Sequence, residues 1–205
     1  NSVTTIEDDA FRWCYFEKGN FINKSSLDAE ANNNWGAAIV ESEENGFVIK
    51  DGVLVAYCGN ESNVTIPNSV TTIGNQSFWQ CYGLTSVTIP NSVTKIEYNA
   101  FYNCTNLSSI TIPSSVTSIG SDAFLGTAWY NNQPDGLVYA GNIAYQYKGT
   151  MPANTSITIK EGTTGITESA FYGCSGLTSI TIPNSVTDMG NETFSYCPDL
   201  TLAVI

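Results

Sequence analysis

The chain has 205 residues, with 7 basic and 19 acidic side chains and no histidine. A net charge of -12 repels nucleic acid phosphates and anionic lipid headgroups, so we expect neither as a partner. The lack of histidine excludes Ser-His-Asp and Cys-His nucleophilic sites and histidine-ligated zinc. No apolar run approaches the ~20 residues of a membrane helix.

The chain opens on NSVTTIEDDAF, which matches the middle of a unit that returns at residues 68–78. Repeat segments follow at 1–14, 63–127 and 155–199, and inserts occupy about 15–62 and 128–154. One phenylalanine recurs in these segments, with steps of 23, 23, 47 and 23 residues from Phe78 onward. Such a strict period is typical of a solenoid, so we expect a single domain over residues 1–205. The predicted buried spine consists of Phe11, Phe78, Phe101, Phe124, Phe171 and Phe194.

Both inserts carry strand and hairpin signals. In the first, residues 25–30 favour a short helical turn, and strands are predicted at 37–40, 47–50 and 53–57. The Asp51-Gly52 pair predicts a tight hairpin turn, because that turn needs positive φ twice. The second insert predicts a hairpin over 136–149 that turns near 140–142. We match Tyr57, Gly59 and Gly52 of the first insert with Tyr147, Gly149 and Gly141 of the second.

Within one repeat, Val87 and Ile89 alternate with polar residues, which predicts a strand with one buried face. Pro90 ends that strand because it has no amide hydrogen to donate. Val93 and Ile96 form a second inward pair. The spacing from Ala100 to Cys104 predicts a single helical or 3₁₀ turn.

The unit LTSITIPNSVTDMGNETFSYC at 177–197 resembles the BspA-type leucine-rich repeat of bacterial surface proteins. The resemblance implies a mostly β, right-handed leucine-rich-repeat superhelix of short parallel strands, interrupted here by the two hairpin inserts. It also implies export, display on the cell surface and adhesion to host matrix proteins or neighbouring cells. Two departures, Gly126-Thr127 in place of the cysteine and Lys160-Glu161-Gly162 in place of Pro-Asn-Ser, put the regularity of the coil in question there.

Five of the six cysteines fall in one inward column, and Cys58 lies apart in the first hairpin. Bridges are usual in exported proteins, but a thiol also serves as a small buried hydrophobe and side chains stacked in parallel have poor disulfide geometry. We therefore expect free thiols. The column consists of Cys14, Cys81, Cys104, Cys174 and Cys197.

Carboxylates are the only acid-base candidates, and they are scattered over corners and inserts, where solvated charge explains them. The acidic stretch 41–44 lacks the spacing of a calcium loop. We therefore predict no catalytic residue, no metal site and no cofactor. The carboxylates considered are Asp8, Asp9, Glu43, Glu44, Glu97, Asp122, Glu168, Asp188 and Glu192.

Candidate binding residues are those that the repeat does not bury. The aromatic side chains that follow the spine phenylalanines suit contact with sugars or proteins, although packing between coils would also explain them. The serine and threonine columns of the strands are candidates as well, although threonine simply favours strands. The candidates are Trp79, Tyr102, Tyr172, Ser86, Thr88, Ser109, Thr111, Ser179 and Thr181. Trp35, Trp129 and Tyr130, at the mouths of the inserts, are expected to cover the core beside them.

Three functions fit this sequence. The first is a non-catalytic, cell-surface or secreted adhesion module that binds an extracellular protein or glycan of the host or of neighbouring cells. The second is a structural spacer within a larger surface protein. The third, an enzyme acting on polysaccharide, depends on the carboxylates alone. We expect an extracellular location, with any signal peptide or anchor lying outside this chain.

Overall fold

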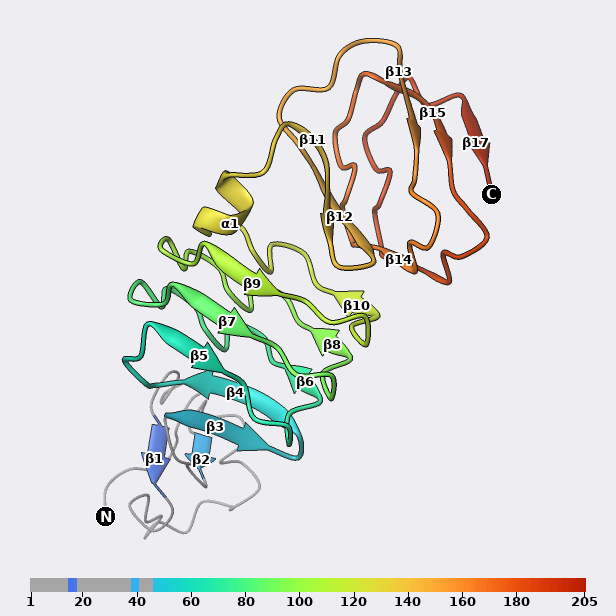
Figure 1. Ribbon diagram of the computed structural model, residues 1–205. Coiled ribbons are helices and arrows are strands. Elements are labelled where there is room, and N and C mark those ends of the chain that lie inside the picture. Colours follow the sequence, from blue (N-terminus) through green and yellow to red (C-terminus); the bar gives the residue numbers. More distant parts are fainter. Residues whose placement is uncertain (1–14, 18–37, 41–45) are drawn as a thin grey trace, which may run out of the picture.

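The computed structural model describes residues 15–17, 38–40 and 46–205. Each repeat forms one coil that contains two short strands, here called the leading and the trailing strand. Figure 1 shows these coils stacked in two groups, a first stack over 46–127 and a second stack over 155–205, with the second hairpin between them and the strands of the two stacks running in different directions. The fold is therefore the mostly β solenoid that the repeat predicts.

The leading strands pair in parallel from coil to coil. In the first stack they are β5 (Asn63–Thr65), β7 (Ser86–Thr88) and β9 (Ser109–Thr111). In the second they are β13 (Thr155–Thr158), β15 (Leu177–Thr181) and β17 (Leu202–Val204). The register places Thr65 beside Thr88 and Thr88 beside Thr111, so equivalent residues align along the stack.

The trailing strands make separate parallel sheets. The first stack has β6 (Thr72–Ile73), β8 (Lys95–Ile96) and β10 (Ser118–Ile119), and the second has β14 (Gly165–Ile166) and β16 (Asp188–Met189). After each Ile-Pro pair a tight turn closes, as when the Val93 amide donates to the Pro90 carbonyl at 3.1 Å. Lys160 makes the same turn through the Thr163 amide at 3.2 Å, so this departure does not interrupt the coil.

The predicted helical or 3₁₀ turn before each cysteine is wrong. Residues 99–104 form successive β-turns instead, because Asn99 and Asn103 adopt positive φ (55° and 56°), which a right-handed helical turn does not allow. This arrangement frees alternate amides to bond to the next coil, as from Phe101 to the Ala123 carbonyl at 2.8 Å. The described residues contain one α-helix, α1 (Ala128–Asn131), which the sequence did not predict.

The phenylalanine spine is confirmed where the structure describes it. Phe78, Phe101, Phe124 and Phe171 are fully buried. The Phe78 and Phe101 rings stack with centroids 4.8 Å apart, and those of Phe171 and Phe194 lie 5.3 Å apart. Phe194 is half-buried in the last complete coil of this chain. Phe11 lies outside the described residues, as do the helical turn predicted at 25–30 and Trp35.

Both predicted hairpins are present. The first consists of β3 (Phe47–Lys50) and β4 (Val53–Tyr57), and Asp51 and Gly52 both have positive φ (51° and 79°) at its turn. The second consists of β11 (Gly136–Ala140) and β12 (Ile143–Lys148), which turns at 141–142. The strand predicted at 37–40 corresponds to β2 (Ala38–Val40), which pairs with β1 (Tyr15–Glu17), a strand that the sequence did not predict.

The two hairpins are equivalent, with one correction to our alignment. Each contributes its second strand as the trailing strand of a coil, since β4 pairs with β6 and β12 pairs with β14. The Thr71 amide donates to Gly52, whereas the Thr164 amide donates to Asn142. Gly52 therefore corresponds to Asn142 and not to Gly141, because the turn glycine takes the second position in one hairpin and the first in the other.

The second hairpin packs against both stacks. Val138, Ala140, Ile143 and Tyr145 belong to the core of the first stack. Leu137, Tyr139, Ala144 and Tyr147 belong to that of the second. The two sets alternate along β11, and a register shift in the pairing with β12 places Ala144 opposite Tyr139 and Tyr147 opposite Leu137. The hairpin therefore has two apolar faces, one toward each stack.

Tyr145 completes the last coil of the first stack. Its hydroxyl accepts a hydrogen bond from the Phe124 amide at 3.0 Å, at the position where Phe78 and Phe101 use a carbonyl of the next coil. Its ring packs edge-on against Phe124, with centroids 5.4 Å apart. Trp129 and Tyr130 cover the same end, as expected: Trp129 packs edge-on against Phe124 at 5.1 Å, and Tyr130 is buried against Tyr145.

Replacing Phe101 with alanine should lower the free energy of unfolding by about 3 to 5 kcal/mol, because the cavity lies between two covered rings. Phe194→Ala, at a half-buried ring, should cost clearly less. Urea denaturation measures both variants. A loss below about 1 kcal/mol for Phe101→Ala would contradict the role of the spine.

Tyr145→Phe should destabilise the chain by about 1 to 3 kcal/mol, because the buried Phe124 amide loses its acceptor while the ring is kept. Tyr82→Phe is the control, since that side chain is 52% exposed. Equal stability of the two variants in thermal and urea unfolding would show that the Tyr145 hydroxyl contributes nothing.

Candidate binding surface

The aromatic residues that follow the spine phenylalanines lie in the turns between the trailing strand of one coil and the leading strand of the next. The surface that they form is here called the aromatic face. Trp79 is 39% exposed and Tyr172 is 52% exposed, whereas Tyr102 is half-buried. Of the two interpretations that the sequence allowed, outward exposure holds for Trp79 and Tyr172, and partial packing holds for Tyr102. Tyr196 is 73% exposed and packs against Tyr172, with ring centroids 5.0 Å apart. The repeat period of the sequence does not single out Tyr196 as a candidate.

A shallow pocket of about 350 Å³ lies beside this tyrosine pair. Tyr172, Glu192, Gln146 and Ser169 line it, together with Tyr147 and Ala170. The second hairpin contributes Gln146 and Tyr147, so the insert helps to form the surface. An aromatic ring beside amide, carboxylate and hydroxyl groups can contact both the apolar and the polar parts of a ligand.

The polar columns of the leading strands face outward, as predicted. Thr88, Thr111 and Thr181 are exposed, while Val87 between Ser86 and Thr88 is buried. Ser109 is exposed, and Ser86 and Ser179 are half-buried. Neighbouring coils are linked by these side chains: the Ser86 hydroxyl donates to Asn63 Oδ1 at 2.6 Å, and those of Ser179 and Ser156 are bonded at 2.7 Å. The serines are therefore partly engaged within the stack.

The prediction that the carboxylates are scattered is wrong for three of them. Glu97, Glu168 and Asp188 line one groove of about 350 Å³, the junction groove, where the trailing strands of the two stacks meet. The sequence does not indicate this grouping, because Glu97 lies in the first stack and Glu168 and Asp188 lie in the second. The second insert sets the orientation of one stack relative to the other. Asp8, Asp9, Glu43 and Glu44, including the acidic stretch 41–44, lie outside the described residues.

Among the residues that the structure describes, no group of three or more His, Cys, Asp or Glu side chains could hold a metal ion. None of the helices in the described part is long and apolar enough to cross a membrane. Cys58, Cys81, Cys104, Cys174 and Cys197 are free thiols. Cys14 lies outside the described residues. Thr127 occupies the cysteine position of its coil, where its hydroxyl accepts from the Tyr130 amide at 3.0 Å and so begins α1.

The family model described as "BspA type Leucine rich repeat region (6 copies)" matches residues 49–133 and 141–205. The chain belongs to the BspA-type leucine-rich repeat family. No curated protein matches the chain.

Three solved structures similar to this BspA-type chain come from bacteria. The T. pallidum leucine rich repeat protein TpLRR is 24% identical over 74% of this chain and 62% of its own, with a TM-score of 0.43. A leucine rich cell surface protein from Faecalibacterium prausnitzii is 32% identical over 74% and 34%, with a TM-score of 0.38. A leucine-rich repeat protein from Bacteroides ovatus is 30% identical over 80% and 38%, with a TM-score of 0.39. This chain therefore spans less than two thirds of each.

The cysteines of this BspA-type chain should differ in reactivity. Cys58 is exposed and should react first with a thiol reagent, whereas Cys104 is fully buried and should react only after unfolding. Desolvation by the neighbouring residues, together with the nearby Cys81, raises the pKa of the exposed Cys58 thiol, so less thiolate forms near pH 8 and its labelling should be slower in the folded chain than in the unfolded one. Burial, together with the nearby Cys197, also raises the pKa of Cys174, to about 11.

Titration before and after unfolding tests this order, with Cys58→Ser expected to remove the fast phase. A thiol count near zero after unfolding without reductant would contradict free thiols.

Proposed function

We propose that this chain is a non-catalytic binding module of a cell-surface or secreted protein, which presents its solenoid surface to an extracellular protein or glycan. Exposure of aromatic side chains on the aromatic face supports this proposal most directly. Among the described residues, four phenylalanines are fully buried, whereas Trp79 is 39% exposed and Tyr172 is 52% exposed. Exposed aromatic rings contribute contact area at low entropic cost when a partner covers them.

The family supports the same function, since repeat solenoids offer wide surfaces for contact. One similar solved structure is that of a leucine rich cell surface protein. We propose an extracellular location for this chain as well. We retain residues 1–205 as a single solenoid domain in this proposal. Ser86, Thr88, Ser109, Thr111, Ser179 and Thr181 remain candidates for an additional polar contact.

The proposal is tested on an array of matrix proteins, mucin and glycans. The Trp79→Ala/Tyr102→Ala/Tyr172→Ala variant should bind its ligand at least about tenfold more weakly than the wild type, because the contact area of three rings is lost. Tyr82→Ala is the control, since it removes an aromatic ring that is 52% exposed and belongs to neither the aromatic face nor the junction groove. Unchanged binding by the triple variant would exclude the aromatic face, and no binding by the wild type would favour the spacer.

A further inference from the structure

The junction groove exists because small residues occupy its middle. Ser118, Gly120 and Gly165 line it at positions where neighbouring coils carry Lys95, Glu97 and Asp188. Long side chains on either side and short ones between them leave a hollow that runs from the trailing strand β8 past β10 to β14 and β16. None of the residues of the aromatic face lines it.

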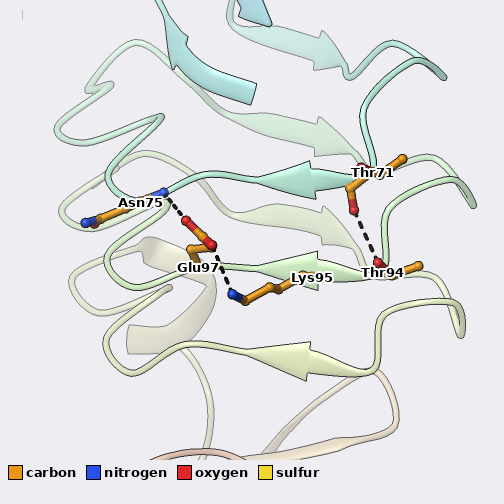
Figure 2. Close-up of polar contacts among 5 residues, drawn as sticks. All are labelled: Thr71, Asn75, Thr94, Lys95 and Glu97. Atoms are coloured by element: carbon orange, nitrogen blue, oxygen red, sulfur yellow. Dashed lines mark hydrogen bonds and ion pairs between the residues drawn. The ribbon is translucent and has the colours of Figure 1, made fainter. Parts of the chain in front are cut away.

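Among the described residues that line the groove, Lys95 is the one basic residue, and it is already paired. Lys95 Nζ lies 3.0 Å from Glu97 Oε1, and the other carboxylate oxygen of Glu97 accepts the Asn75 amide at 3.1 Å. Figure 2 shows Glu97 between these two partners. Lys95 therefore neutralises Glu97 on one wall and leaves the charge of the opposite wall uncompensated.

The opposite wall carries two exposed carboxylates, Glu168 and Asp188. Within the described part of the chain, neither is joined to a basic side chain by an ion pair. The groove thus retains two negative charges, in a chain whose net charge of -12 already attracts cations.

The floor of the groove adds backbone carbonyls as hydrogen-bond acceptors. In the preceding coil, the Thr94 and Ile96 carbonyls accept the Thr117 and Gly120 amides at 2.9 and 2.8 Å. Strand β10 is the last of its sheet, so the corresponding carbonyls of Thr117 and Ile119 have no further parallel strand beside them, and both residues line the groove. Tyr98, 47% exposed, adds an aromatic ring to the lysine side.

We propose that the junction groove binds an arginine side chain presented by an extended basic segment of a protein partner. A guanidinium has five N–H donors in a planar fork, which suits a site that combines carboxylates with carbonyl acceptors, and it stacks on aromatic rings. A lysine ammonium would compensate the negative charge, but it lacks the planar set of N–H donors that a guanidinium offers. A neutral sugar would not compensate the charge. The inference rests on the proposed binding function, but it uses a different surface.

The test is fluorescence anisotropy with a labelled seven-residue peptide of glycine and serine that carries two arginines. The same peptide with lysine, and with neutral citrulline, provides the ligand controls. Glu168→Gln/Asp188→Asn removes the groove charges, and Glu161→Gln/Asp199→Asn removes two exposed charges elsewhere, so both variants have the same net charge. Tyr98→Leu removes the ring.

We expect the groove variant to weaken binding of the arginine peptide about tenfold or more and the charge-matched control to weaken it less than about twofold. Tyr98→Leu should weaken it about threefold, and lysine and citrulline peptides should bind progressively less well. Equal effects of the two double variants would overturn the proposal in favour of general charge attraction. Displacement of the peptide by neutral glycans would overturn it in favour of a sugar site.

Failure of this inference is distinguishable from failure of the proposed function. If the arginine peptide does not bind the wild-type chain while a ligand on the array does, only the proposal of the groove is excluded. Array binding that does not depend on the aromatic face, with intact peptide binding, excludes only the aromatic face.

Discussion

Coil-to-coil stacking of equivalent residues is the interaction on which this structure depends. Phenylalanine rings repeat at 4.8 and 5.6 Å along the first stack, close to the separation of paired strands, so one side chain serves as the core of its own coil and the cover of the next. Backbone amides follow the same rule, since the amides of Phe78 and Phe101 donate to the next coil. Stability is therefore shared between neighbours, and each end of a stack needs a cover.

The two hairpins cover the ends of the first stack. Tyr57 packs on Phe78 with ring centroids 5.1 Å apart and so extends the spine into the first hairpin. At the other end of the first stack, Tyr145 and Trp129 take the place of a further coil. The second hairpin also supplies Ala144 to the core of the second stack. An insertion that breaks the repeat count thus joins two stacks, and it creates both the pocket beside Tyr172 and the junction groove.

The period of the sequence predicted the spine, the leading strands and the outward threonines, and the strand and turn signals of the inserts predicted both hairpins. It failed where a backbone conformation is set by contacts between coils, as at Asn99 and Asn103, whose positive φ directs amides to the next coil. It also failed where the stacks change direction, because no local pattern places Glu97 near Glu168. Tyr172 could be selected from its position after Phe171, but its partner Tyr196 has no counterpart in the period.

We propose that the second hairpin makes the two stacks one cooperative unit. Hydrogen exchange across a urea titration measures it most directly, because peptides from β7 and β15 report the two stacks separately. We expect both peptides of the wild-type chain to lose protection at the same urea concentration and with the same free energy of opening. Two separate transitions, with β7 and β15 exchanging independently, would contradict the claim.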